Sequence, residues 1–202
     1  MKKNYFKPML ALALVVAMMV GGTLAYITSV TDKYDNSFVI ATPGDASDYL
    51  AISLDETFTL NGESVLDQTQ TSGTATFLPG DEITKKPIVS LDKLDIATLT
   101  EGAYVFVQIT DEDDVMSDLG FTINEEDWTA LEGETGVYYR KQDAQVDARI
   151  ALPDVFSIST IAIRDNYTYQ SANARVLSVQ AFAIQANNLD TPALAWNAIQ
   201  NI

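Results

Sequence analysis

A regular alternation of apolar and polar residues in the middle of the chain is the feature that most restricts its fold. Between Leu50 and Leu60 every second residue is apolar, except at Glu56, and the residues between them are polar or small. Successive side chains of a strand point to opposite faces, so this pattern predicts one buried face and one exposed face. Such strands are typical of antiparallel sheets. Asn61-Gly62 follows directly and predicts a tight hairpin turn.

Other segments extend this pattern along the chain. Residues Ala103–Thr110 are apolar on both alternating faces, which predicts a central strand covered on both sides. Pro192, preceded by Asp190 or Thr191 as a cap, predicts a short C-terminal helix. Together, about nine or ten short strands and one short helix predict an all-β fold, an antiparallel β-sandwich. The strand pattern alone leaves jelly-roll and immunoglobulin-like topologies open.

The first 25 residues are typical of a secretory signal peptide. Three lysines lie within the first seven residues, an apolar run follows from Met9 to Val20, and small residues come next. The run is shorter than the roughly 20 residues that a membrane-spanning helix needs, which argues against a permanent membrane anchor. We expect cleavage between Ala25 and Tyr26. The predicted organisation is a signal peptide (1–25), an N-terminal strand (26–35) and a sandwich domain (36–202).

The segment Tyr26–Asp35 that follows the expected cleavage site has the pattern of a strand. No neighbouring segment is predicted to be its hairpin partner. It can therefore pair within its own domain, or it can add to the sheet edge of another copy. In the second case the side chains of the polymerisation strand would be Tyr26, Ile27, Val30, Tyr34 and Phe38.

Composition narrows the class of protein. The chain has no cysteine, so no disulfide can form, and for an exported protein this fits a bacterial cell surface better than a eukaryotic secretory route. Its formal net charge is −16, and removal of the lysine-bearing leader makes the mature part still more negative. Such a surface repels phosphate groups, so nucleic acid and anionic lipid are not expected as partners.

The residues that usually perform catalysis are missing. The chain contains no histidine and no cysteine, which excludes Ser-His-Asp triads, Cys–His pairs and the usual zinc sites. It contains no glycine-rich phosphate loop, and no isolated pair stands out among its 28 acidic residues. We therefore do not expect an enzyme.

Two groups of residues remain as weak binding candidates. Asp111, Asp113 and Asp114 are clustered oxygen donors of the kind that Ca²⁺ prefers. The residues that follow do not match an EF-hand, and a solvated turn at the end of a strand is the alternative. Trp128, Tyr138 and Tyr139 form a possible carbohydrate platform, although aromatic residues in strands are more often core residues or cross-strand pairs.

Four motifs, taken together, carry a resemblance to a known family. They are GGTLAYITSV followed by Asn36-Ser-Phe38, the turn Phe77-Leu-Pro79-Gly80-Asp81 followed by Lys86, the strand Ala103–Val107, and the segment Val179–Ala186 with Trp196 downstream. In this order and spacing they resemble the TasA/camelysin family of exported proteins. The signals of that family are cut by a dedicated peptidase of the SipW type. Leu24 departs from the pattern, since the family often has an aromatic residue there.

The resemblance implies a jelly-roll sandwich and a secreted structural subunit of biofilm-matrix or pilus-like fibres. Its partners would be copies of itself in a head-to-tail filament, formed after a SipW-type signal peptidase frees the N-terminal strand. The expected location is the extracellular matrix or cell surface of a Gram-positive-type bacterium. Camelysin-type relatives are described as metalloproteases, but the usual zinc ligands are absent here, so that activity is not carried over. The alternative is a monomeric surface module that binds carbohydrate or protein.

Overall fold

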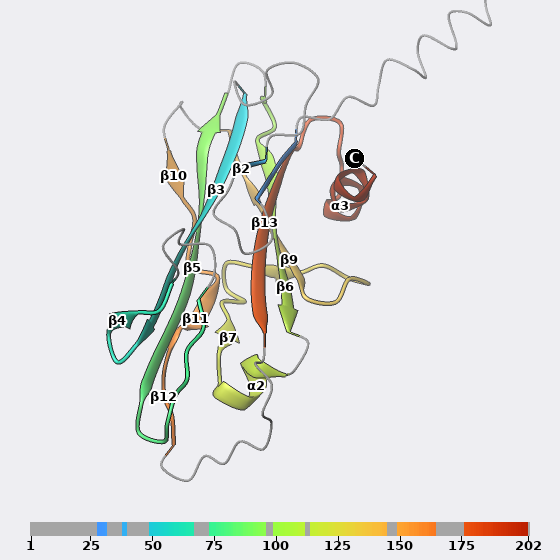
Figure 1. The fold of residues 1–202 in the computed structure, drawn as a ribbon. Coiled ribbons are helices and arrows are strands. Elements are labelled where there is room, and N and C mark those ends of the chain that lie inside the picture. Colours follow the sequence, from blue (N-terminus) through green and yellow to red (C-terminus); the bar gives the residue numbers. More distant parts are fainter. Residues whose placement is uncertain are drawn as a thin grey trace, which may run out of the picture.

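The protein is an antiparallel β-sandwich made of two main sheets (Figure 1). The computed structural model describes residues 28–31, 38–39, 49–66, 73–95, 99–111, 114–144, 149–164 and 176–201. The chain passes from one sheet to the other after β2, after β5, after β9 and after β12, as in sandwiches of the jelly-roll type. The all-β sandwich with a short C-terminal helix that the sequence predicts is confirmed.

The first sheet, sheet A, contains both the earliest and the last described strands of the chain. In spatial order its strands are β2 (Phe38–Val39), β1 (Thr28–Thr31), β13 (Leu177–Gln185), β6 (Ala103–Asp111), β9 (Val137–Gln142) and β8 (Thr129–Ala130). All of these pairings are antiparallel. Strand β13 therefore lies between the N-terminal strand and the centre of the sheet.

The second sheet, sheet B, is built on one long pair of strands. In spatial order its strands are β10 (Ile150–Ala151), β5 (Glu82–Leu94), β3 (Leu50–Leu60) and β4 (Glu63–Ser64), and β12 (Thr160–Ala162) also pairs with β5. A small third sheet joins β7 (Thr122–Ile123) to β11 (Phe156–Ile158). The described helices are α2 (Val115–Leu119) and α3 (Pro192–Gln200).

Strand β3 and its turn follow the sequence prediction closely. The strand spans Leu50–Leu60 and pairs along its length with β5. Asn61 and Gly62 both have positive φ angles, 53° and 82°, which is the combination that a two-residue type I′ hairpin turn needs. The turn brings Thr59 opposite Ser64 and starts the short strand β4.

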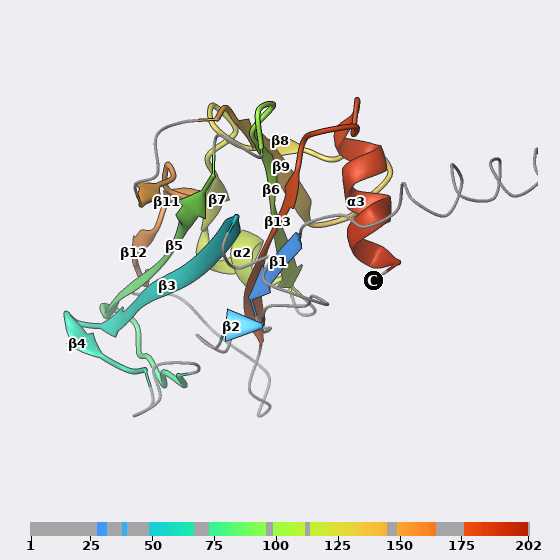
Figure 2. The same cartoon turned by 90° about the horizontal axis from the view of Figure 1, so that it is seen from above.

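Strands β6 and β13 are covered on both faces, as predicted for β6. Their inward side chains, including Val105, Val107, Val179 and Ala181, join the core between the sheets. Their outward side chains join a second core beneath helix α3, which lies on the face of sheet A turned away from sheet B (Figure 2). The members of this second core that β6 and β13 supply are Tyr104, Phe106, Phe182 and Ile184.

Helix α3 begins and docks as its sequence indicates. Thr191 is the N-cap, and its side chain accepts a hydrogen bond of 3.2 Å from the backbone N–H of Leu194. Pro192 occupies the first turn, where its missing N–H has no cost. Trp196 is 3% exposed, and its ring centroid lies 5.2 Å from that of Phe106 and 5.3 Å from that of Phe182. This aromatic cluster fixes the helix to sheet A.

Two irregular places in sheet B have a physical reason. Pro87 predicts an edge or a bulge, yet β5 has neighbours on both sides. β12 pairs with residues 82–84 of β5 and β10 with residues 90–91, so Pro87 lies in the gap between these partners, where no N–H is required. Near Thr160 the chain leaves β11, paired with β7, and begins β12, paired with β5.

A buried ion pair joins strands β3 and β5 of sheet B. Glu56 of β3 and Lys85 of β5 have side chains that are 8% and 6% exposed, and Lys85 Nζ lies 2.5 Å from Glu56 Oε1. The Lys85 ammonium also lies 5.6 Å from the ring centroid of Phe58. Glu56, which interrupts the apolar face of β3 in the sequence, is therefore compensated by a lysine on the neighbouring strand.

Candidate functional site

The segment predicted to mediate polymerisation forms strand β1 of its own sheet. Thr28, Ser29 and Val30 lie opposite Ile184, Ala183 and Phe182 of β13. On its other side, β1 pairs with β2, where Val30 lies opposite Val39 and Thr31 opposite Phe38. The expectation that no neighbouring segment pairs with this strand is wrong, because β2 is its hairpin partner. In the single chain, the N-terminal strand is thus paired internally.

The burial of strand β13 explains why β1 is accommodated beside it in sheet A. Ala183 and Ile184 of β13 are fully buried, one in each of the two cores, and Phe182 is 7% exposed. Backbone N–H and C=O groups in such an environment must be hydrogen-bonded. Strand β1 supplies a neighbouring backbone for this part of β13.

The residues predicted for this site lie only partly within the described chain. Val30 belongs to β1 and Phe38 to β2. The expected cleavage site at Ala25 and Tyr26, and the predicted strand residues Ile27 and Tyr34, lie outside the described residues.

The turn motif of the resemblance, Pro79-Gly80-Asp81, forms a hydrogen-bonded type II turn. The backbone N–H of Asp81 donates to the C=O of Leu78 at 3.1 Å, and Gly80 has a φ of 93°. The Asp81 carboxylate accepts hydrogen bonds from the Leu78 N–H at 2.6 Å and from the Asn61 side-chain amide at 2.9 Å. Asn61 in turn accepts from the Glu82 N–H at 2.8 Å. Asp81 therefore joins its own turn to the β3–β4 hairpin.

These hydrogen bonds give a testable prediction for the Asp81 carboxyl group. The Asn61 amide, and then the Leu78 N–H, hold the pKa of Asp81 below its usual value of 3.8. A carboxyl group whose pKa is lowered by folding stabilises the fold above its unfolded pKa, and this contribution is lost as the pH falls through the folded pKa. We expect Asn61→Ala to raise the pKa of Asp81 towards 3.8, measured by carboxyl-carbon NMR titration. An unchanged midpoint would show that the amide contributes nothing.

Of the weak calcium candidates, Asp111 has another role in the structure. The two carboxylate oxygens of Asp111 accept hydrogen bonds from the backbone N–H groups of Val115 (2.6 Å) and Met116 (3.0 Å), at the start of helix α2. Asp114 precedes that helix with a φ of 55°, and Asp113 lies outside the described residues. Among the residues that the structure describes, no group of three or more acidic, histidine or cysteine side chains is placed to hold a metal ion.

The aromatic candidates for carbohydrate binding are not arranged as a platform. Trp128 is fully buried, and its indole N–H donates to the C=O of Pro153 at 3.2 Å. Arg140 covers the indole ring, with its guanidinium carbon 5.8 Å from the ring centroid. Tyr138 and Tyr139 are half-buried and lie opposite β8. Trp128 is therefore a core residue, as is more usual for aromatic residues in strands, and not part of an exposed platform.

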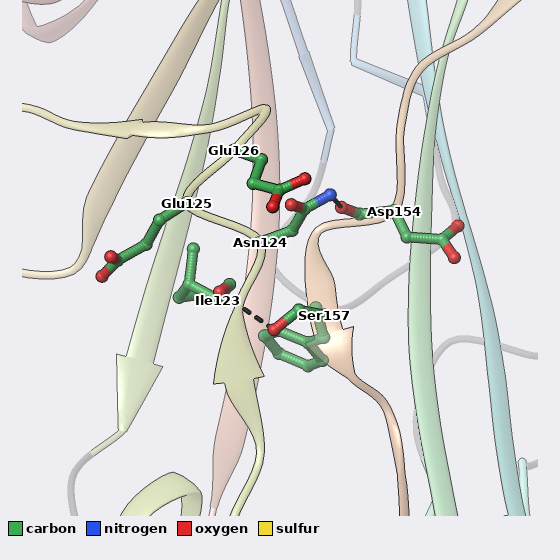
Figure 3. A pocket seen from close by; sticks show the side chains of 7 residues that line it. Ile123, Asn124, Glu125, Glu126, Asp154 and Ser157 are labelled. Carbon is green, nitrogen blue, oxygen red and sulfur yellow. Dashed lines mark hydrogen bonds between the residues drawn. The ribbon is translucent and has the colours of Figure 1, made fainter.

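A shallow acidic pocket of about 480 Å³ lies where β7 and β11 meet (Figure 3). Its lining residues include the acidic Glu125, Glu126 and Asp154 and the apolar Ile123 and Phe156. The sequence gives no sign of it, because the two sides of the pocket lie about thirty positions apart and the β7–β11 pairing brings them together.

Hydrogen bonds and an ion pair engage several polar groups of this pocket. The Asn124 amide donates to the Asp127 carboxylate (3.0 Å) and to the C=O of Asp154 (3.1 Å). The Asp154 carboxylate lies 2.8 Å from Lys86 Nζ. The pocket residues include acidic and hydroxyl side chains, whose chemistry suits the attraction of positive charge.

Comparison of the chain with protein-family models, with curated proteins and with solved structures gives no significant match. The resemblance to the TasA/camelysin family thus depends on the motifs in the sequence. In the described part of the chain, neither helix has the length and apolar character needed to cross a bilayer.

Proposed function

We propose that the protein is a secreted structural subunit of extracellular fibres, whose copies are joined by exchange of strand β1. The N-terminal leader and the family motifs support export and a fibre role. The position of β1 supports the mode of joining, because this strand begins only a few residues after the expected cleavage site. Removal of the leader would leave β1 close to a free chain end, where it can move to another subunit.

The pairing of β1 with β13 is the observation that carries the proposal. The described contact consists of three register pairs, from Thr28–Ile184 to Val30–Phe182. The same strand from a second copy would find the same partners, so exchange conserves these contacts while it links two subunits. Because the contact is head-to-tail, repetition produces an open filament. Exchange of a strand that is already paired in its own chain thus replaces the simpler idea that the N-terminal strand has no partner there.

Exchange competes with pairing inside the chain. A segment that is tethered by a short linker is present at an effective concentration of about millimolar for its own domain. We therefore expect the processed protein to be monomeric when dilute and to assemble when it is concentrated or seeded.

A reversible disulfide provides the sharpest test. Ser29 and Ala183 are register partners on β1 and β13, and the wild-type chain has no cysteine. In the double variant Ser29→Cys, Ala183→Cys, a bond between these neighbouring positions would hold β1 in its own domain. We expect the mature oxidised variant to form no fibres by electron microscopy and the reduced variant to form them. Fibres of normal length under both conditions would rule out strand exchange.

Deletion of residues 26–35 is a second test, and fibres are expected to be lost. Because the deletion also removes β1 from sheet A, its folded state is checked by circular dichroism. A deletion variant that forms normal fibres would contradict the mechanism.

The alternative function is a monomeric surface module that binds carbohydrate or protein. The acidic pocket beside β7 and β11 is the observation that favours it. Size-exclusion chromatography of the concentrated mature protein separates the two functions. A stable monomer at all concentrations, with or without seeds, would favour the binding module.

A further inference from the structure

The ion pair between Glu56 and Lys85 has an unusual environment for two charges. The two residues come from adjacent strands of sheet B, 29 positions apart in the chain, and their side chains are at most 8% exposed. Lys85 lies on the face of β5 that also carries the buried residues Ile83 and Val89, and the Phe58 ring lies 5.6 Å from its Nζ atom. Both groups are thus enclosed in the core rather than placed at its rim.

The distance between the two groups is short. Lys85 Nζ and Glu56 Oε1 are 2.5 Å apart, whereas an ammonium and a carboxylate usually lie about 2.7–2.9 Å apart. Since a carboxyl C–O bond is about 1.2–1.3 Å long, Nζ can be no further than about 3.8 Å from the Glu56 carbonyl carbon, Cδ. A small rotation of either side chain brings the nitrogen to the distance of about 3–3.5 Å from which it can attack that carbon.

Burial also favours the neutral form of Lys85, which amide formation needs. A buried ammonium carries a large desolvation cost that disfavours its charged form. In agreement with this, burial lowers the pKa of Lys85, and the attraction of Glu56 opposes the shift without cancelling it. The neutral amine that this shift favours is the nucleophilic form of the lysine.

We propose that Lys85 and Glu56 become joined by an intramolecular amide bond in the folded protein. A proton passes from Nζ to a carboxylate oxygen of Glu56, the Nζ lone pair attacks Cδ, the C–OH bond breaks, and a second proton from Nζ leaves with that hydroxyl as one molecule of water. No oxidant, reductant or cofactor takes part. The product is a covalent link between β3 and β5.

Two effects favour the bond in this position. Groups held in contact can react as though their effective concentration were about 10⁵–10⁸ M, which offsets the tendency of amides to hydrolyse in water. The reaction also replaces two buried charges with a neutral amide and releases water to the solvent. The chain contains no cysteine, so this link would give an exported fold the type of covalent closure that a disulfide otherwise supplies.

The chain contains a matched control for this chemistry. Lys86, the next residue, forms an ion pair with Asp154 at 2.8 Å, but these side chains are 37% and 47% exposed. Water reaches both side chains there, so this pair lacks the enclosure of the Lys85–Glu56 pair. The proposal therefore applies to Lys85 and not to Lys86.

Intact-mass measurement of the purified wild-type protein tests the proposal directly. We expect a mass that is lower, by one water molecule, than the mass calculated from the mature sequence. Proteolysis and fragmentation should give a branched peptide that contains both Glu56 and Lys85. Lys85→Arg should have its full calculated mass, because a guanidinium does not form this amide, whereas Lys86→Arg should keep the loss of water.

Each outcome decides the question. A wild-type protein at its full calculated mass, or a loss of water that maps to other residues, overturns the proposal. If Lys85→Arg does not fold, the wild-type mass and the branched peptide still give the answer, since they do not depend on any variant.

Discussion

Replacement of Lys85 by methionine is expected to lower the free energy of unfolding by about 3–5 kcal/mol, because the variant leaves the Glu56 carboxylate buried without a cation. Methionine fills a similar space, so the loss reports the missing charge rather than a cavity. Urea denaturation followed by tryptophan fluorescence measures the change, since the chain has two tryptophans and both are buried. A loss below about 1 kcal/mol would contradict the interpretation of Glu56 as a charge that depends on Lys85.

Two controls separate the contribution of charge from that of burial. Lys86→Met breaks the exposed pair with Asp154, and a pair of this kind contributes at most about 1 kcal/mol. The double variant Glu56→Leu, Lys85→Met replaces the whole ion pair by apolar side chains and should recover most of the stability that the single variant loses. The intact mass of the wild-type protein is measured first, because an amide would add its own stabilisation to the reference state.

Replacement of Trp196 by alanine is expected to lower the free energy of unfolding by about 3–5 kcal/mol, the usual cost of removing a large buried aromatic side chain. The indole lies against both Phe106 and Phe182 and is 3% exposed, so its removal leaves a cavity between α3 and sheet A. The near-ultraviolet circular dichroism signal should also decrease, because Trp196 is one of only two tryptophans in the chain.

Leu194→Ala is the matched control on the same helix. Leu194 is 52% exposed, so its truncation should change the stability by no more than about 0.5 kcal/mol. If Trp196→Ala is equally mild, helix α3 does not contribute to the stability of the sandwich, and the second core would have to be reassessed.

The sequence predicts the elements of this fold best where one short-range rule is enough. The alternation from Leu50 to Leu60 sets strand β3, and Asn61-Gly62 sets its turn. Pro79-Gly80 sets a second turn, and Thr191 followed by Pro192 starts helix α3. In each case the signal is local. Either one or two residues require a particular backbone conformation, or apolar residues recur with a fixed period along a single element.

Features that depend on pairing between distant segments could not be predicted in the same way. Helix α2 is a local exception: it is only five residues long and its first N–H groups bond to the side chain of Asp111, four residues before Val115, so the periodicity of the sequence gives no sign of it. The acidic pocket requires the β7–β11 pairing, and the burial of Trp128 requires its contact with Pro153. The position of β1 beside β13 joins segments that are about 150 residues apart, for which no local signal exists.

The β1–β2 pairing limits how far apart successive subunits of a fibre can lie. If β2 remains with its own domain when β1 moves, the chain from Thr31 to Phe38 must bridge two subunits, and seven extended residue steps cover at most about 25 Å. An incoming β1 lies about 5 Å from the resident β2, so equivalent Phe38 positions in successive subunits would be separated by no more than about 30 Å. A filament with a longer axial repeat would require the β1–β2 hairpin to transfer as one unit.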